Sequence, residues 1–422
     1  MNLAAWILVA SLGAVAGWAF VSYLTTMPIK MARFLTLTLI ALAFSAALIV
    51  WRFRGTALLG AFALLLAAVF VGYWAAAVRV LGREDDRFVP ECTRAEDDRG
   101  DGHVAVVYFT HGEPETYDPI GWLNQFREFD DQGIAFVPFL ARPLFLYALR
   151  RAYLTVGSSQ HRSRHIAMAR RVEQELRADV GDDSRVYPSF LDDDPRPDAA
   201  LIQALNDGAS EIVVAEVFVS ISNHTREGEE LVEAVDTDRF DVPVRFTGPL
   251  WDSHTLHRMF LEKVEEARGT IPPERVAVLL VGHGQPDEWD KEWPTETQHE
   301  IELRTSVLEL LAQNGYDRSK IDLAWMEFKQ PRVAGRASDL ALTGIDMLAY
   351  FSAGISAESI HSQYDVPKLI AEAEIPAGIS VVNLGAWNDH PLAIQAIAER
   401  VKRMVRTAAP EVRPAAEGRV PS

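Results

Sequence analysis

The sequence predicts an α/β protein with two parallel-sheet domains related by internal duplication, preceded by three membrane helices. Three observations support this fold class. Beyond residue 103, short apolar runs of strand length alternate with amphipathic helical stretches, as in parallel sheets covered on both faces. Nearly the same stretch occurs twice, as VAVVYFTHGEP (104–114) and VAVLLVGHGQP (276–286), which indicates a repeat. Three long apolar runs precede both copies.

The N-terminal region, residues 1–83, predicts three transmembrane helices. It contains six Lys and Arg residues but no Asp or Glu. Its apolar runs, at about 3–24, 34–51 and 58–80, are close to the ~20 residues needed to cross the hydrocarbon core. No basic residue precedes the first run and further runs follow it, which disfavours a signal peptide. Basic residues in the first loop and after the third run favour a multi-pass protein of the inner or cell membrane, with its N-terminus outside and its large body cytoplasmic.

Composition divides the rest of the chain and excludes some functions. A charged, turn-rich stretch at 84–102 predicts a linker, followed by an N-terminal α/β domain (103–250) and a C-terminal one (251–408) that holds the metal site. Three prolines in the last 13 residues predict a disordered tail at 409–422. All 59 acidic residues lie beyond residue 83, which argues against a nucleic-acid partner. Cys92 is the only cysteine, so a disulfide framework and Cys-based metal sites are excluded.

Each domain is predicted as an alternation of strands and helices. In the first, we expect strands at 104–109, 185–190 and 211–220, with helices at 163–178 and 199–207. In the second, we expect strands at 276–281, 321–326, 347–352 and 380–384, and helices at 297–314, 366–373 and 391–405, with a further helix ending at 338–343.

Both copies place histidines where parallel strands end. His111 and His283 directly follow the first strand of each copy, and His224 and His361 lie in loops beyond a later strand. Ligands bind at the carboxyl ends of parallel strands. Two imidazoles that converge there could hold ferrous iron, cobalt, nickel or zinc, and could also accept a proton.

The C-terminal pair is the stronger candidate site. His283 and His361 are expected as metal ligands and catalytic residues, with Glu358 as a nearby catalytic carboxylate. Asp365 follows His361 by four residues, so a helical turn would place both on one face. His111 and His224 could form a second site or a vestigial one. His161, His165, His254 and His257 lie in polar helical or loop sequence and are expected to be solvated.

Several stretches resemble the class II chelatases, which comprise ferrochelatases and sirohydrochlorin chelatases. GHGQPDEWDKEWP (282–294) is similar to the ferrochelatase segment around the catalytic histidine, and WNDHP (387–391) is similar to the Leu-Asn-Asp-Ser-Pro segment of that family. RAYLTVGSS (151–159) and the preceding FVPFLARPLFLYALRR (136–151) resemble the region that lines the porphyrin pocket. The resemblance implies two flavodoxin-like halves with a macrocycle between them. It also implies substrate-binding residues, which are Arg142, Arg151, Tyr153 and Ser158.

The second metal motif departs from the ferrochelatase pattern. SAESIHSQYDVP (356–367) places His361 where ferrochelatases carry a catalytic Glu, and HSQYDVP resembles the sirohydrochlorin chelatase motif in which this histidine binds metal. The resemblance therefore implies a membrane-anchored ferrochelatase-type enzyme of haem or tetrapyrrole biosynthesis. It would insert a divalent metal, Fe²⁺ or alternatively Co²⁺, into a porphyrin and release two protons.

Two other functions stay open. They are a sirohydrochlorin cobalt or iron chelatase and a non-catalytic tetrapyrrole or metal carrier. The expected partners are a tetrapyrrole macrocycle, a divalent metal ion and the lipid bilayer, with no prosthetic group. A homodimer is left open.

Overall fold

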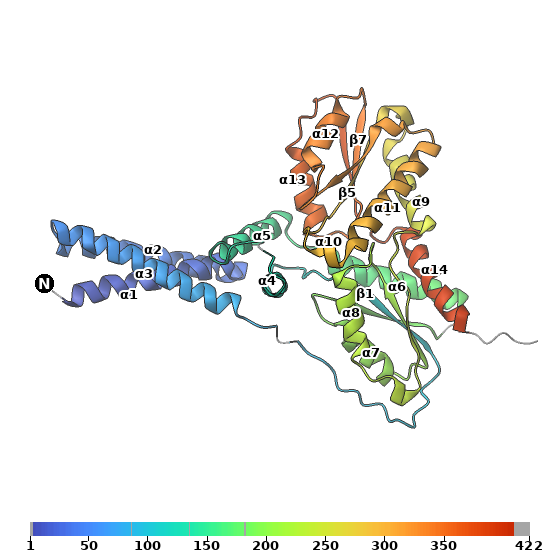
Figure 1. Ribbon diagram of the computed structural model, residues 1–422, viewed down its shortest axis with the longest axis horizontal. Helices are drawn as coiled ribbons and strands as arrows, with labels where there is room; N and C mark the ends of the chain where they lie inside the picture. The colour runs from blue at the N-terminus through green and yellow to red at the C-terminus, as the bar shows by residue number, and fades with distance from the viewer. Residues whose placement is uncertain (1–2, 86, 135, 181–182, 409–422) are drawn as a thin grey trace, which may run out of the picture. The chain divides into compact units, whose positions relative to one another are not determined.

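A computed structural model describes residues 3–85, 87–134, 136–180 and 183–408 (Figure 1). The chain divides into two compact units. The first, here called the helical unit, comprises Met1–Arg87 and Glu113–Ser159. The second, the α/β unit, comprises Phe88–Gly112 and Gln160–Ser422. The tail expected at 409–422 lies outside the described residues.

The helical unit contains the three predicted apolar helices, α1 (Leu3–Thr25), α2 (Pro28–Arg52) and α3 (Thr56–Leu81). All three are long and apolar enough to cross a membrane, since helices of this length extend about 35–39 Å at 1.5 Å per residue. Glycines let α1 and α3 pack closely. A methyl group added at Gly17 would lie 2.0 Å from the Val69 carbonyl oxygen, and one at Gly72 would lie 2.0 Å from that of Ala14.

The segment Glu113–Ser159 folds with these apolar helices, a grouping that is not visible in the sequence. It contains α4 (Ile120–Asp131), the short turn η1 (Phe139–Ala141) and α5 (Arg142–Val156). One buried cluster joins the end of α3 to α4 and α5, and its members are Ala77, Leu81, Leu123, Phe126 and Leu146. The helices α4 and α5 therefore share a hydrophobic core with the last turns of α3.

The α/β unit contains two parallel four-stranded sheets with the same strand order, which confirms the predicted fold class. The first sheet has the order β2-β1-β3-β4 and the second has the order β6-β5-β7-β8. The strands of the first sheet are β1 (Val104–Thr110), β2 (Arg185–Phe190), β3 (Glu211–Glu216) and β4 (Val244–Phe246). Those of the second are β5 (Val276–Gly282), β6 (Ile321–Trp325), β7 (Met347–Ser352) and β8 (Ser380–Gly385).

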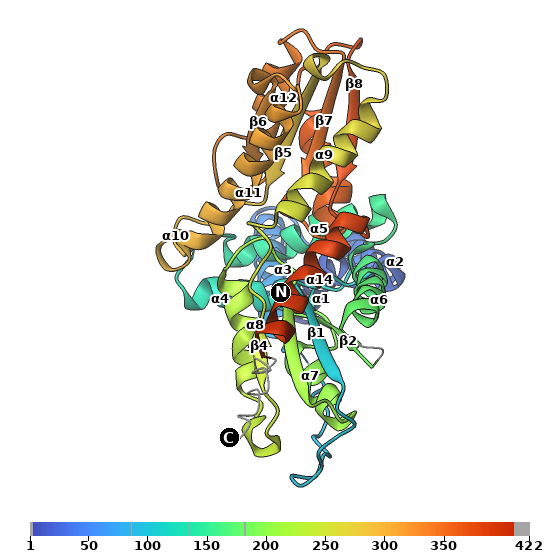
Figure 2. The same cartoon turned by 90° about the vertical axis from the view of Figure 1, so that its right-hand side faces the viewer.

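Helices cover both faces of each sheet, as Figures 1 and 2 show. The first repeat contains α6 (His161–Asp179), α7 (Pro197–Asn206), α8 (Asn223–Glu233) and α9 (His254–Arg268). The second contains α10 (Trp289–Glu292), α11 (Pro294–Gln313), α12 (Val333–Ala341), α13 (Val366–Ala371) and α14 (Pro391–Ala408). Short turns are η2 (Asp238–Phe240), η3 (Pro273–Arg275), η4 (Arg318–Lys320) and the π-helical η5 (His361–Asp365).

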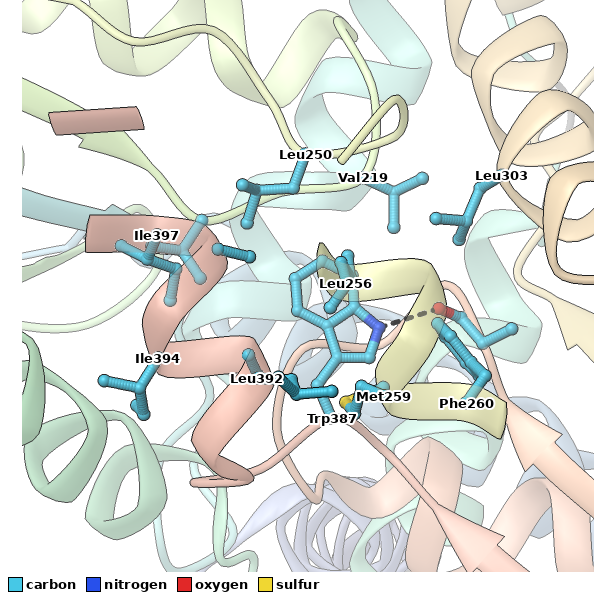
Figure 3. Close-up of a cluster of buried hydrophobic side chains, with 14 of the residues drawn as sticks. Val219, Leu250, Leu256, Met259, Phe260, Leu303, Trp387, Leu392, Ile394 and Ile397 are labelled. Atoms are coloured by element: carbon cyan, nitrogen blue, oxygen red, sulfur yellow. Dashed lines mark hydrogen bonds between the residues drawn. The ribbon is translucent and has the colours of Figure 1, made fainter. Parts of the chain in front are cut away.

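The two repeats exchange their last helices. The helix α9, which follows the first sheet, packs against β7, β8 and α11 of the second repeat, whereas α14, which follows the second sheet, packs against β3 and α6 of the first. One hydrophobic core therefore runs through both repeats. Figure 3 shows its junction, where Trp387 lies among side chains of α9 and α14 and donates a hydrogen bond from Nε1 to the Ala353 carbonyl oxygen at 3.0 Å.

Three local predictions differ from the structure. The strand expected at 211–220 ends earlier, at Glu216, and the three-residue strand β4 was not predicted. His224 lies in the first turn of α8 rather than in a loop, because Ser222 and Thr225 form a capping box that starts the helix there.

Candidate metal site

The first strand of each repeat ends on a histidine held by a tight turn. His111 follows β1 and His283 follows β5, and the next residues, Gly112 and Gly284, have φ angles of 97° and 83°. A methyl group added at Gly284 would lie 2.5 Å from the Glu327 carbonyl oxygen. Glycine is therefore needed at this turn both for its conformation and for the close approach of the neighbouring strand.

Matching hydrogen bonds fix the two histidines. The carbonyl oxygen of His111 accepts from the Asp192 backbone N–H at 2.8 Å, and that of His283 accepts from Glu327 at 3.1 Å. Each ring places Nδ1 near the carbonyl oxygen of its own following glycine, at 3.1 Å for His111 and 2.7 Å for His283. Because a carbonyl oxygen only accepts, Nδ1 carries the proton and Nε2 keeps the lone pair that can bind a cation.

The structure brings the four predicted histidines together as two pairs. The ring centroids of His283 and His361 lie 5.2 Å apart with the ring planes at 74°. Those of His111 and His224 lie 4.6 Å apart at 72°. All four side chains are half-buried. Each repeat therefore presents one edge-to-face imidazole pair near the carboxyl ends of its strands.

A carboxylate orients His361, as the spacing of four residues predicts. The Nδ1 atom of His361 lies 2.8 Å from Oδ2 of Asp365, within the π-helical turn η5. The side chain of Gln363 in the same turn accepts a hydrogen bond from the Gln160 backbone N–H at 3.1 Å, which ties the turn to the start of α6. The position of His361 thus depends on contacts from both repeats.

Two further carboxylates, which were not predicted from the sequence, lie beside the histidine pairs. Asp192 places Oδ2 3.1 Å from Nδ1 of His111, and the charge of Glu327 acts on His283. Both residues come directly after the second strand of their repeat and donate their backbone N–H to that repeat's first histidine. Their shared position in the duplicated sequence is the signal that could have identified them.

Electrostatics favours neutral imidazoles at the site. Partial desolvation and the neighbouring His361 lower the pKa of His283. Desolvation, together with His111 and His283, lowers the pKa of His224 well below its usual range. The neutral ring is the form that binds a metal ion, so both residues are ready to act as ligands near neutral pH.

His257 in α9 is buried rather than solvated, and the prediction is also wrong for His161 and His165, because α6 turns both of their rings into the interior. Their ring centroids are 4.4 Å apart. Hydroxyl groups surround His165. Tyr108 lies 2.8 Å from Nδ1, and Thr110 and Ser356 each lie 3.2 Å from Nε2. Burial lowers the pKa of His165 to about 3, so a neutral ring links the two repeats.

Beneath His283 lies an acidic residue from α11 that sequence reasoning also missed. The carboxylate of buried Glu300 accepts from the His283 backbone N–H at 3.1 Å and pairs with buried Arg304 at 3.7 Å. The ion pair fills the space beside Gly282, where a methyl group would lie 2.2 Å from Oε2 of Glu300. No sequence pattern connects a strand-end histidine with a helix residue 17 positions later.

Glu358 directs its carboxylate to the loop around Asn388. Its Oε1 accepts from the Ala386 backbone N–H at 3.1 Å and from the Asn388 side chain at 3.0 Å, and its Oε2 accepts from Ser362 at 2.5 Å. These hydrogen bonds connect the WNDHP motif to the turn that carries His361. The expected catalytic role of Glu358 stays a prediction, and the contacts suit a positioning residue.

The four residues expected to bind the macrocycle belong to the helical unit. Arg142 forms an ion pair with Asp130, with Nη1 2.7 Å from Oδ2, and the Tyr153 hydroxyl donates to the Pro114 carbonyl oxygen at 3.1 Å. Arg151 and Ser158 are exposed. Their role in macrocycle binding stays a prediction.

Among the residues that the structure describes, no three His, Cys, Asp or Glu side chains are arranged to hold a metal ion. The candidate ligands of each repeat are the two rings of its histidine pair, whereas Asp192 and Asp365 lie beside Nδ1 of a ring.

The chain is similar to one known family and to several solved structures. The family model described as Ferrochelatase matches residues 103–405. Among solved structures, SirB from Bacillus subtilis with Fe3+ is 16% identical and has a TM-score of 0.47, with 71% of this chain and 95% of that chain covered. CbiX, described as the terminal enzyme for biosynthesis of siroheme in denitrifying bacteria, is 16% identical with a TM-score of 0.43, and the match covers 72% and 98% of the two chains.

A third solved structure is the sirohydrochlorin chelatase SirB from Bacillus subtilis subspecies spizizenii in complex with cobalt. It is 12% identical with a TM-score of 0.41, and the match covers 72% of this chain and 97% of that chain. A search of curated protein sequences found no match.

Proposed function

This chain belongs to the ferrochelatase family and is a metal chelatase that acts on a tetrapyrrole, and we propose that it inserts Fe²⁺ into a porphyrin at His283 and His361. The observation that supports this site is the edge-to-face pairing of the two rings, 5.2 Å apart, with His283 after β5 and His361 in the turn η5. Imidazole is a good ligand for ferrous iron and for neighbouring first-row metals.

The chemistry requires proton acceptors as well as metal ligands. A divalent ion replaces two pyrrole N–H protons, so the metalloporphyrin forms as two protons leave and charge is conserved. The neutral rings of His283 and His361 first hold the incoming ion, and each can accept a proton once the ion passes to the macrocycle nitrogens. Glu327 and Asp365 stabilise the imidazolium forms, since each carboxylate lies close to one of these histidines.

Two observations bear on the identity of the macrocycle. The match to the ferrochelatase family supports a porphyrin. His361 in place of the Glu of the ferrochelatase pattern supports the alternative, a sirohydrochlorin chelatase that uses cobalt or iron. A carrier that binds a tetrapyrrole without inserting metal is the non-enzymatic alternative, and measured turnover separates it from both.

We further propose that α1–α3 cross the inner or cell membrane, with the α/β unit on the cytoplasmic side. The length and apolar composition of the three helices support this placement. Lys30 and Arg33 in the first turns of α2, together with Arg83 just after α3, support the orientation. A membrane anchor suits an enzyme whose substrate is a poorly soluble, flat macrocycle.

A metal-insertion assay tests the proposed site. The full-length protein in detergent is mixed with a porphyrin and Fe²⁺, Co²⁺ or Zn²⁺, and insertion is followed by the change in porphyrin absorbance. His283→Ala and His361→Ala should abolish insertion while leaving porphyrin binding intact. His254→Ala, at an exposed histidine that begins α9, is the matched control. Unchanged insertion by His283→Ala would refute the proposed site, and porphyrin binding without insertion of any metal would support a carrier.

A further inference from the structure

We propose that α5 lies flat in the surface of the lipid bilayer, with one face against the ends of α1 and α3 and the opposite face in contact with lipid. The inference rests on the membrane placement of α1–α3 proposed above. It goes beyond that placement, because α5 is too short and too rich in arginine to have been predicted as part of a membrane segment.

The inner face of α5 is attached where two of the apolar helices end. Its buried Arg150 donates to the carbonyl oxygens of Tyr23 and Thr26 at the end of α1, at 2.5 and 2.9 Å. Buried Leu146 packs with Ala77 and Leu81 in the last turns of α3. These contacts place α5 at the level where α1 and α3 would leave the hydrocarbon core.

The start of α5 reaches below that level. The Tyr73 hydroxyl donates to the Leu140 carbonyl oxygen at 2.6 Å. Tyr73 lies eight residues before the end of α3 at Leu81, which corresponds to about 12 Å along the helix. Interfacial helices bury their apolar face ~5–10 Å into the boundary between headgroups and acyl chains. The turn that precedes α5 therefore lies beside the last turns of α3, slightly deeper than the depth that an interfacial helix reaches.

The outer face of α5 has the character of a lipid-contacting surface. Leu144 and Leu154 are each 51% exposed, and Leu140, just before the helix, is 39% exposed. Exposed apolar side chains in such a row are unusual on a surface in water. The helices α1–α3 of the same unit also expose many large apolar side chains.

Charge supports a lipid surface over a protein partner. The chain from Gln132 to Val172 contains no Asp or Glu, although the body as a whole is acidic. Arg142 and Arg150 are occupied by Asp130 and by backbone carbonyls, whereas Arg151 is exposed beside the apolar row. An apolar face flanked by arginine and free of acidic residues suits lipid headgroups that carry phosphate.

A site-specific fluorescent label tests the proposal. Cys92 is the only cysteine, so Cys92→Ser provides a background for single cysteines in the full-length protein. Leu144→Cys carries a bimane label, and the protein is reconstituted in phosphatidylcholine–phosphatidylglycerol vesicles that contain a nitroxide-labelled lipid. We expect the lipid quencher to lower the fluorescence at residue 144 at least twofold.

Two controls make the outcome specific. Leu342→Cys carries the label on a 79% exposed leucine of the α/β unit and should be insensitive to the lipid quencher. Phe44→Cys carries it on a 66% exposed side chain in α2 and should be quenched strongly. The proposal for α5 alone is overturned if the lipid quencher acts strongly on the label at residue 44 but no more on residue 144 than on residue 342. Weak quenching at 44 overturns the membrane placement itself.

A second quencher identifies any other occupant of this face. In the same vesicles, aqueous iodide should quench the label at residue 342 and have a reduced effect at residue 144. A label at 144 that is shielded from iodide but insensitive to the lipid quencher would show that protein or macrocycle covers this face, which also overturns the proposal. A melting temperature of Leu144→Cys within a few degrees of that of the Cys92→Ser background confirms that the variant is folded.

Discussion

The Nδ1 atom of His361 lies 2.8 Å from the Oδ2 atom of Asp365, one turn along the same π-helix. Because a carboxylate only accepts, this contact places the ring proton on Nδ1 and directs the Nε2 lone pair to the cation. The same contact stabilises a positive charge on the ring after it accepts a pyrrole proton. Asp365 is thus a positioning residue for the proposed reaction.

Asp365→Asn tests that role. The amide oxygen can still accept the hydrogen bond but carries no charge, so the ring keeps its orientation and loses its electrostatic support. We expect the rate of metal insertion to fall by about 10- to 100-fold, as is typical when a partner of a metal-binding histidine is changed. Porphyrin binding, measured by fluorescence quenching, should be unchanged. Asp339→Asn, on the exposed face of α12, is the control, and equal rates for both variants would contradict the role of Asp365.

Glu358 and Asn388 form a reciprocal pair. The Glu358 backbone N–H donates to Oδ1 of Asn388 at 2.9 Å, and the Asn388 amide donates back to Oε1 of Glu358 at 3.0 Å. Glu358→Gln and Asn388→Ala should each destabilise the fold by about 1–3 kcal/mol, the usual cost of leaving a buried polar group without its partner. Both should lower the melting temperature and the insertion rate to similar extents.

The comparison of these two variants separates positioning from catalysis. If Glu358 accepted a proton in the reaction, Glu358→Gln would abolish insertion at an unchanged melting temperature, and Asn388→Ala would leave most of the activity. Thermal unfolding and insertion rates measured on the same preparations distinguish the two roles.

The sequence predicts part of the site because some contacts are local. His111 and His283 end apolar strands and are followed by glycine, and His361 precedes Asp365 by one helical turn, so spacing alone indicates their placement. Asp192 and Glu300 act on these histidines from a different strand and a different helix. Such contacts depend on how distant segments pack. The repeated position of Asp192 and Glu327 is the one sequence signal for the first contact, and no sequence pattern indicates the second.

Contacts between distant segments also limit how much of the fold the sequence predicts. The strands β2 and β7 have the predicted bounds because each is a short run of strand length between helical stretches. The exchange of α9 and α14 between repeats leaves no local pattern, since either sheet could bury the apolar face of either helix. The burial of His161 and His165 has the same origin. Both rings are buried, and hydroxyl groups from β1 and from the loop after β7 contact the ring of His165.

The two histidine pairs predict two cation sites in one chain. His111 and His224 match the C-terminal pair in ring geometry and in the contact from Nδ1 to a glycine carbonyl. Titration of the detergent-solubilised protein with Co²⁺, followed by its visible absorption, should give two equivalents for the unsubstituted chain. His111→Ala and His283→Ala should each bind one equivalent, and the double variant should bind none. If the unsubstituted chain binds only one equivalent of Co²⁺ and His111→Ala still binds it, the N-terminal pair is vestigial.

The buried ring of His165 predicts that the α/β unit loses stability in acid. Its pKa is about 3 in the folded protein, against about 6.5 for an exposed histidine. Between these values the unfolded chain holds a proton that the folded protein does not, so the free energy of unfolding decreases as the pH falls from about 6.5 toward 3. The full contribution is present only above pH ~6.5. This residue alone accounts for up to about 1.4 kcal/mol per pH unit.

His165→Gln removes that titration and keeps a side chain that can hydrogen-bond to the surrounding hydroxyl groups. The variant is expected to be less stable than the unsubstituted protein at pH 7, because a glutamine cannot reach all three hydroxyls. The informative quantity is therefore the difference between melting temperatures at pH 7 and pH 5, measured for both proteins. That difference should be several degrees smaller in His165→Gln. An equal difference in the two proteins would show that other groups carry the acid sensitivity, and that His165 is protonated without loss of the fold.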